Sequence, residues 1–289
     1  MVERFRIKKG DTLLMVDFLN MFYKSAAIHK NLSHNGIPTG GLFGVATAIS
    51  SYVLKFRPSK IVICSDCPPY FRKLEYPEYK ENRNTKDKDQ IAKNEAERKL
   101  CREFIHKTGI PFLEIKGLEA DDIFALLSDK YNYAYNRLIA VSNDSDLMQL
   151  FRHENFHMYK SNTGKLYSLT DFKMDHPEIT PRQWVDVLAY TGGHNNLNGI
   201  DDVGIITAKK LITNKAFYTK NYVKFIKSNK KRIEKEKQLT KIPFYKFKTD
   251  IVMPHRGKFN SRDVIRFLSS HGITYTDRME KAFGYIHNK

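Results

Sequence analysis

Seven acidic side chains in the first half of the chain are the residues best suited to do chemistry. Three of them each end a short apolar run, and tight acidic groups occupy positions 119–122 and 144–146. Carboxylates cannot gather in this number and stay ionised unless cations offset their repulsion. Mg²⁺ or Mn²⁺ prefers oxygen ligands, and a pair of such ions stabilises the attacking and leaving oxygens of a phosphodiester. The candidate metal ligands are Asp17, Asp66, Glu119, Asp121, Asp122, Asp144 and Asp146.

A plainer explanation exists for some of these acids, because aspartate is common at helix N-caps and in turns. Asp121 or Asp122 fits a cap at the start of a helix. Capping does not explain acids at three separate strand ends together with two acidic pairs. The pattern therefore predicts a metal site that acts on a phosphodiester.

The elements that position these acids read as an α/β fold. Short apolar runs at Thr12–Asp17, Lys60–Asp66 and Arg137–Asp144 predict buried strands, and helical patterns lie at Leu42–Lys55 and Ala120–Lys130. This alternation predicts a central, mostly parallel sheet flanked by helices. Because open α/β sheets place their sites at the carboxyl ends of the strands, we expect the acids to converge at one edge.

Charge narrows the class of partner. The 289 residues include 49 Lys and Arg against 32 Asp and Glu, a formal charge of +17. Such a surplus favours a polyanion, with nucleic acid preferred over an anionic membrane surface. Three cysteines, no signal peptide and no apolar run long enough to span a bilayer predict a soluble protein of the cytoplasm with no membrane partner.

A basic segment follows the second predicted strand. Tyr79, Lys80 and Arg83, preceded by Phe71-Arg72, place cations beside the acidic group, where they can stabilise charge on a scissile phosphate. The stretch from about 75 to 102 is strongly charged and almost free of aliphatic residues. It predicts either a solvated surface loop or a mobile element that orders over substrate. After Thr180 the pattern becomes helical, which divides the chain into 1–180 and 181–289.

In this order the motifs resemble the 5′-nuclease superfamily, which includes phage 5′-exonucleases, flap endonucleases and the 5′-nuclease domain of bacterial DNA polymerase I. The resemblance covers nearly the whole chain, and the combination is specific although each motif alone is not. It rests on Asp17, Asp66, Phe71-Arg72, Pro77-Glu-Tyr79-Lys80-x-Asn82-Arg83, Glu119-Ala-Asp121-Asp122, Ser142-x-Asp144-x-Asp146 and Pro181-x-Gln-Trp184-x-Asp186 through Gly192.

The resemblance implies a role for each motif. Asp17, Asp66, Glu119 and Asp121 would hold one ion, and Asp122, Asp144 and Asp146 would face a second. The catalytic group would be Lys80 and Arg83 on the scissile phosphate, with Arg72 beside them and Tyr79 stacked on a base. Residues 75–102 would form a helical arch through which a free 5′ strand passes.

The chain departs from the family pattern at the second metal site. Gly193 and Asn195 stand where two aspartates are expected, as in the short bacterial homologues that also lack these acids. We expect the second ion to bind weakly, through Asp144, Asp146 and water. His194 is an alternative ligand, although a surface-loop histidine is the simpler interpretation.

A glycine-containing hairpin follows and resembles the helix–hairpin–helix element of the family, at about 184–212. Glycines let backbone amides approach phosphates, and the family loop also holds K⁺. The alternative is a plain helix-joining turn, and the charge of Asp202 opposes phosphate binding. The candidate DNA-binding residues are Gly199, Gly204, Thr207, Lys209 and Lys210.

Two weaker signals have bland explanations. Cys64-Ser-Asp-Cys67 has the spacing of half a zinc site or a redox pair, but no second pair exists and packing cysteines are the better interpretation. The lysine-rich stretch Lys227–Lys241 is either a solvated helix face or a phosphate-contacting surface.

The leading hypothesis is a monomeric 5′-3′ exonuclease or flap endonuclease acting on branched or nicked DNA in a bacterial or phage-infected cell. A DNA-binding homologue that cuts weakly is the first alternative, because the second metal site is incomplete. An aspartyl phosphotransferase would need a second aspartate where Leu19 stands. A PIN-type ribonuclease shares the acids but does not need Pro181–Lys210.

Overall fold

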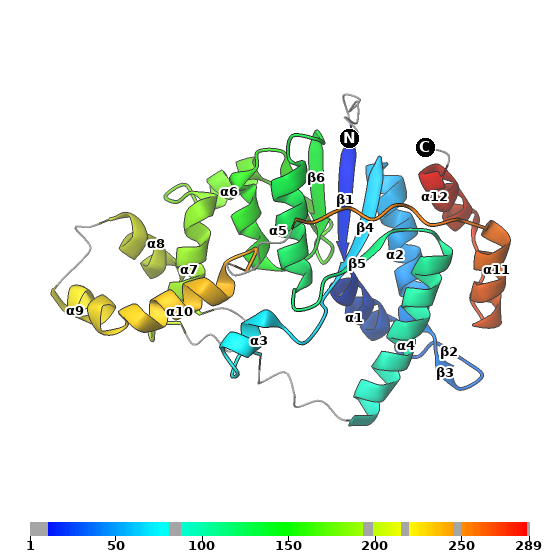
Figure 1. The fold of residues 1–289 in the computed structure, drawn as a ribbon, viewed down its shortest axis with the longest axis horizontal. Helices are drawn as coiled ribbons and strands as arrows, with labels where there is room; N and C mark the ends of the chain where they lie inside the picture. Colours follow the sequence, from blue (N-terminus) through cyan, green and yellow to red (C-terminus); the bar gives the residue numbers. More distant parts are fainter. Residues whose placement is uncertain (1–10, 81–87, 193–198, 215–219, 245–249, 288–289) are drawn as a thin grey trace.

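A six-stranded sheet forms the centre of the molecule in a computed structural model that describes residues 11–80, 88–192, 199–214, 220–244 and 250–287 (Figure 1). The strand order is β5-β4-β1-β6-β7-β8, and every neighbouring pair is parallel except β7 and β8. The predicted mostly parallel sheet is therefore confirmed. Its strands are β1 (Thr12–Asp17), β4 (Lys60–Ser65), β5 (Phe112–Glu114), β6 (Arg137–Val141), β7 (Phe156–Lys160) and β8 (Lys165–Ser168).

Strand β1 is apolar throughout because both of its faces are covered. Leu13 and Met15 pack into the core on one side of the sheet, and Leu14 and Val16 into the core on the other. The parallel register pairs Asp17 with Cys64 and Val16 with Val141. As a result the carboxyl ends of β1, β4 and β6 meet at one edge, and the predicted acids follow directly.

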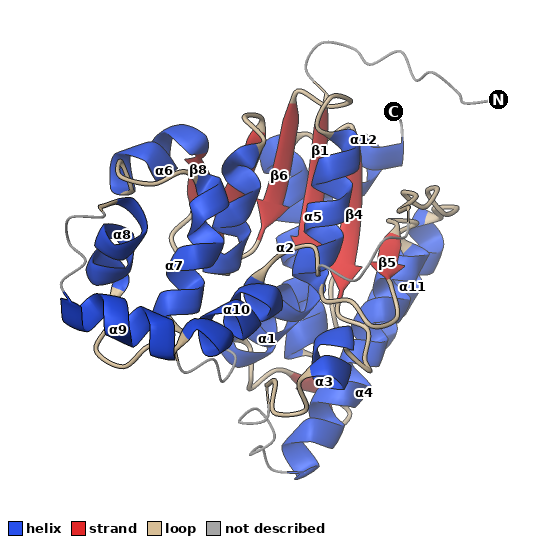
Figure 2. Cartoon of the chain, turned by 60° about the vertical axis from the view of Figure 1, so that its left-hand side comes forward, coloured by secondary structure: helices blue, strands red, loops and turns tan. Residues whose placement is uncertain are grey.

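Helices cover both faces of the sheet (Figure 2). The core that contains Leu14 and Val16 is completed by α1 (Phe18–Ile28), α2 (Gly40–Phe56), α4 (Lys88–Lys107), α11 (Ser261–Ser270) and α12 (Asp277–His287). The opposite core is completed by α5 (Ala120–Tyr131), the 3₁₀ helix η2 (Ser145–Arg152), α6 (Leu169–Asp175), α7 (Trp184–Thr191), α8 (Ile205–Thr213) and α10 (Lys230–Thr240). The remaining elements are β2 (Ser33–His34), β3 (Ile37–Pro38), α3 (Phe71–Glu75), η3 (Pro181–Gln183) and α9 (Lys220–Ser228).

The C-terminal helices return to the sheet rather than extending the helical region. Helix α12 packs on α2 and α11 packs on α4, with Phe267 and Phe283 buried in the same core as β1. The sequence predicted a DNA-binding region from 181 to 289. Its last part, α11 and α12, instead belongs to the α/β core. Within the described ranges, the structure contains no helix that is both long and apolar enough to span a bilayer.

Helix α4 changes the expected extent of the arch. Cys101, Phe104 and Ile105 are fully buried, and the carboxylate of Glu97 accepts the backbone N–H of Gly41 on α2. The end of the predicted arch is therefore anchored on the core, because a highly charged helix needs only a narrow apolar stripe to pack. Residues 81–87 lie outside the described part of the chain.

Candidate active site

A cavity of about 660 Å³ opens at the carboxyl edge of the sheet and collects most of the predicted acids. Its floor is polar, and the cations and the aromatic ring predicted from the basic segment reach it from α3 and the turn that follows. The lining residues that had been predicted are Asp17, Asp66, Arg72, Tyr79, Lys80, Glu119, Asp121, Asp144 and Asp146.

Three of the acids are held by backbone N–H groups near the start of a helix. An oxygen of Asp17 accepts the N–H of Asn20 at 2.9 Å and caps α1, and Asp144 caps η2 in the same way through Asp146 N–H at 2.9 Å. Asp66 accepts the N–H of Ala120 at 2.9 Å, which joins the end of β4 to the start of α5. Acids therefore cap helices as well as cluster, but the cap of α5 is Glu119 rather than Asp121 or Asp122. The caps fix which way the carboxylates of Asp17 and Asp144 point.

Burial and mutual repulsion strongly raise the pKa values of several of these acids. Burial, with further contributions from Asp66 and Asp144, raises the pKa of Asp17 to about 7. Burial and the charge of Asp144 raise the pKa of Asp146 to about 8. Burial and the surrounding carboxylates hold the pKa of Asp121 well above its usual range. Acids whose pKa values are raised in this way lack a compensating cation. A bound dication would offset their mutual repulsion.

One oxygen shows where that cation fits. In the described part of the chain, Oδ1 of Asp121 is buried and has no hydrogen-bond partner. The available ligands are oxygens, which suits a hard dication. Among the described His, Cys, Asp and Glu side chains, no group of three or more is arranged to hold a metal ion by itself. The carboxylates therefore need water or a substrate oxygen to complete an ion's shell.

Lys80 brings positive charge into the cavity. Its backbone has a φ of 59°, a conformation that residues with a side chain rarely adopt, and its ammonium pairs with Oε1 of Glu119. Burial alone would raise the pKa of Glu119, but Lys80 and Arg72 outweigh burial and lower it. Lys80 thus lies where a phosphate oxygen would enter the acidic pocket.

Asp122 requires a correction. It is fully buried and is not among the described residues that line the cavity. Its two oxygens accept from Arg72 at 2.5 and 2.8 Å and from the N–H groups of Glu119 and Phe244. Because both oxygens are already engaged, the prediction that Asp122 faces a second metal ion is wrong.

Arg72 and Tyr79 also differ from the prediction. The guanidinium of Arg72 is 2% exposed and committed to protein acceptors, so it does not meet a phosphate. The ring of Tyr79 is 3% exposed, and its hydroxyl donates to Glu119 at 3.1 Å. A ring enclosed in this way is not offered to a base, and Tyr79 instead helps to hold Glu119.

Four residues of the predicted site fall outside the description. Arg83 and the loop residues Gly193, His194 and Asn195 lie outside the residues that the structure describes, so their roles stay predictions.

The hairpin explains one glycine clearly. Gly199 has a φ of 55°, and a Cβ added there would lie 2.2 Å from the backbone nitrogen of Gly192. Only glycine permits this approach of two backbone segments. Gly204 precedes α8 and lies in open space, while Thr207 is half-buried and Lys210 is exposed.

Lys209 on α8 also differs from the prediction. Its side chain turns back to α6, where Nζ donates to the backbone oxygen of Asp175 at 3.3 Å and to Glu178 at 3.2 Å. Only 9% of the residue is exposed. Lys209 therefore tethers α8 rather than presenting charge to DNA.

The sequence reasoning missed a polar rim beside Asp17. Asn20, Lys24 and Asn143 line the cavity, and the amide of Asn143 donates to Asn20 and to Ser161 at 3.1 Å. The signal was present, because Asn20 and Lys24 lie three and seven residues after Asp17 and share its helix face. These groups extend the cavity with neutral and positive donors.

The pKa values predict how the metal-free protein responds to pH. In an unfolded chain Asp17 and Asp146 titrate near pH 4, so between about pH 4 and 8 the folded protein holds more protons than the unfolded one. Stability contributed by the protonated acids is then lost as the pH rises through 7 to 8. We expect the melting temperature in EDTA to fall by several degrees across this window and Asp17→Asn to flatten the slope. A pH-independent melting temperature would contradict the clustered acids.

The sequence of this chain is also similar to those of known proteins. Residues 12–179 match the family described as 5′-3′ exonuclease, N-terminal resolvase-like domain. A 5′-3′ exonuclease of Buchnera aphidicola subsp. Schizaphis graminum is 30% identical over 209 residues, covering 71% of this chain and 70% of that protein. DNA polymerase I of Rhizobium leguminosarum is 29% identical over 218 residues, covering 72% of this chain but only 21% of that protein.

A solved structure matches over more of the chain. A bacteriophage T5 flap endonuclease, in a pseudo-enzyme-product complex with DNA and metal ions, covers 96% of this chain and 98% of its own, with a TM-score of 0.67 and 19% identity. At that identity the likeness shows a common fold.

Proposed function

The chain belongs to the 5′-3′ exonuclease family, and on that premise we propose that it is a divalent-metal-dependent 5′ nuclease that hydrolyses phosphodiesters at 5′ ends or junctions of branched DNA. The resemblance to the 5′-nuclease superfamily is thereby confirmed. The observation that carries the activity is the cavity at the carboxyl edge, which six acids line and where one of them, Asp121, has a buried oxygen without a hydrogen-bond partner.

The residues divide the work as follows. Asp17, Asp66 and Asp121 would hold the first ion, with Glu119 at its edge because its oxygens already accept from Lys80, Arg72 and Tyr79. A bound Mg²⁺ or Mn²⁺ supplies a water of lowered pKa and offsets charge at the scissile phosphate. Asp144 and Asp146 would hold a second, weaker ion.

Within this chain, the ammonium of Lys80 would bind a non-bridging oxygen of the scissile phosphate. That contact gains strength as charge develops on the phosphate, so it lowers the barrier more than it tightens substrate binding. Hydrolysis would break the bond between the phosphorus and the 3′ oxygen. One product would then carry a 5′-phosphate and the other a 3′-hydroxyl.

The partner follows from charge and fold. With a net charge of +17 the chain would bind the phosphate backbone of DNA as a monomer in the cytoplasm, and the glycine hairpin at 199–204 would hold K⁺ against the duplex. The T5 flap endonuclease of the same fold forms a complex with DNA and metal ions, which supports DNA as the partner.

A second function, DNA binding with weak cleavage, is favoured by one observation. Gly193 and Asn195 replace two carboxylates of the family pattern, which lowers the charge available to a second ion.

Incubation with a 5′-labelled flap duplex separates the two functions. We expect cutting with Mn²⁺ or Mg²⁺ that stops in EDTA and leaves a 5′-phosphate. Tight binding without cutting in either metal would favour the second function, and cutting in EDTA would contradict both.

The hairpin gives a prediction on DNA affinity. Lys210→Ala should weaken binding to all duplex sequences about equally and lower the slope of log K against log salt by roughly 0.9, because one phosphate contact is lost. Lys209→Ala serves as the comparison and should lower thermal stability, since it removes the tether to Glu178. Fluorescence anisotropy at several salt concentrations measures the slope, and an unchanged slope for Lys210→Ala would show that this helix start does not touch DNA.

A further inference from the structure

The end of helix α10 is linked to the active site by a single side chain, that of Arg72. Arg72 lies 167 residues before Leu239 in the sequence. Nε of Arg72 donates to the backbone oxygen of Leu239 at 2.7 Å, and Nη2 donates to that of Lys241 at 3.0 Å. These carbonyls belong to the last turn of α10, which a helix leaves without internal partners. Arg72 therefore caps the C-terminal end of α10 from below the active-site cavity.

The same guanidinium also holds the start of α5. Nη1 donates to Asp122 at 2.5 Å and to Oε2 of Glu119 at 3.3 Å, and Nη2 donates to the other oxygen of Asp122 at 2.8 Å. A guanidinium has five N–H donors in a fixed plane, and here five acceptors surround it. The ring of Phe244 lies 5.0 Å from its central carbon. This buried geometry is specific to arginine, because an ammonium cannot reproduce the planar fork.

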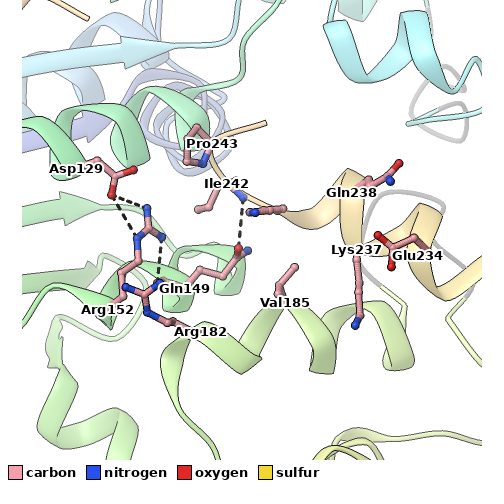
Figure 3. A pocket seen from close by; sticks show the side chains of 11 residues that line it. Asp129, Gln149, Arg152, Arg182, Val185, Glu234, Lys237, Gln238, Ile242 and Pro243 are labelled. Carbon is pink, nitrogen blue, oxygen red and sulfur yellow. Dashed lines mark hydrogen bonds and ion pairs between the residues drawn. The ribbon is translucent and has the colours of Figure 1, made fainter. Parts of the chain in front are cut away.

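A second buried side chain, Gln149, also holds this segment, and Figure 3 shows its hydrogen bond to Ile242. The amide of Gln149 donates to the backbone oxygen of Thr240 at 2.9 Å, and its oxygen accepts the N–H of Ile242 at 3.3 Å. Gln149 lines a second cavity, whose lining in the described part of the chain includes none of the clustered acids. The chain from Leu239 to Ile242 is thus fixed both by Arg72 and by Gln149.

Helix α10 also contacts the segment that leads to Lys80. The hydroxyl of Tyr76 donates to Gln238 at 2.8 Å, and Lys235 pairs with Glu78. Both ends of this segment are therefore tied to α10, and Lys80 follows at once with its ammonium on Glu119. Arg72 stands between α10 and the Glu119–Lys80 pair.

We infer that Arg72 is a positioning residue, which ties α10 to Glu119 and so sets the place of the Lys80 ammonium in the pocket. The inference rests on the proposed function. It assigns Arg72 no contact with substrate, and its effect on cleavage passes through Lys80. A displacement of about 1 Å at a group that meets the reacting phosphate lowers a rate by roughly 100-fold.

The test compares Arg72→Lys with Gln149→Met in the full chain, on a 5′-flap duplex with Mn²⁺. Both substitutions release the 239–242 segment, but only the first also releases Glu119. We expect Arg72→Lys to lower kcat by roughly 30- to 100-fold with KM changed less than about threefold. Gln149→Met should keep kcat within about threefold of the wild type while its melting temperature falls, as expected for a lost buried hydrogen-bond pair.

A double-mutant cycle with Lys80→Ala separates positioning from a general structural role. If Arg72 acts through Lys80, Arg72→Lys should cost less than about threefold in the Lys80→Ala background. Equal losses with and without Lys80, or an equal loss of kcat in Gln149→Met, would overturn the inference. Should Arg72→Lys not fold, Arg72→Gln replaces it in the same cycle, because it also removes the contact with Glu119. It should lower kcat only when Lys80 is present, and an unchanged kcat would overturn the inference. An inactive wild type would overturn the proposed function and this inference with it, whereas an active wild type with an equally active Arg72→Lys overturns the inference alone.

Discussion

Replacing Asp121 with asparagine is expected to lower single-turnover cleavage of a 5′-flap duplex by at least about 100-fold, which corresponds to roughly 2.7 kcal/mol of barrier. The substitution keeps the shape of the side chain and removes one charge from the position where an unpartnered oxygen faces the cavity. Duplex binding should stay within a few-fold of the wild type, since the acid repels phosphate in the absence of metal. Asp17→Asn and Asp66→Asn should behave in the same way.

The control is Asp250→Asn, which changes an exposed acid paired with Lys130 far from the cavity and should leave the rate unchanged. Asp121→Asn should also raise the melting temperature of the metal-free protein, because it removes one of several repelling carboxylates. Retention of more than a tenth of the wild-type rate would argue against the proposed metal site.

The second large effect is on stability and concerns the neighbouring acid. Asp122→Ala should lower the free energy of unfolding by about 3–5 kcal/mol, because it leaves the buried guanidinium of Arg72 without its bidentate partner. Urea unfolding followed by circular dichroism measures the change. The double variant Arg72→Met with Asp122→Leu should recover part of the loss, since it removes both charges together.

Asp146→Ala is the matched comparison. Its carboxylate has a raised pKa and no comparable cation, so its removal should stabilise the metal-free protein at pH 8. A loss below about 1 kcal/mol in Asp122→Ala would show that the pair is not structural. The contacts support Asp122 as the structural acid and Asp121 as the acid that faces the cavity, and that result would contradict this assignment.

The edge of the sheet was predictable from the sequence. An apolar run that ends in an acid is a local signal, and parallel strands bring such ends together whatever the rest of the chain does. Asp17 and Asp66 therefore lie where they were expected, on neighbouring strands whose register is set by buried residues on both faces.

The assignments that failed depended on direction and on distant partners. Successive helical residues point about 100° apart, so Asp121 and Asp122 face different surroundings, and the sequence alone does not show that Asp122 is the one buried against Arg72. The answer comes from Arg72, Phe244 and the end of α10. In the same way, Lys209 turns toward Glu178 on another element, and the sequence near position 209 does not indicate it.

Binding of a divalent metal ion by the clustered carboxylates is tested most directly by calorimetric titration of Mn²⁺ into the metal-free protein. In two buffers of different ionisation enthalpy at pH 7, the wild type should bind about one ion without DNA and release protons, because Asp17 and Asp146 are partly protonated there. Asp121→Asn should weaken this binding at least about tenfold, while Asp250→Asn should not change it. Equal Mn²⁺ affinity and equal proton release in the wild type and Asp121→Asn would contradict the account.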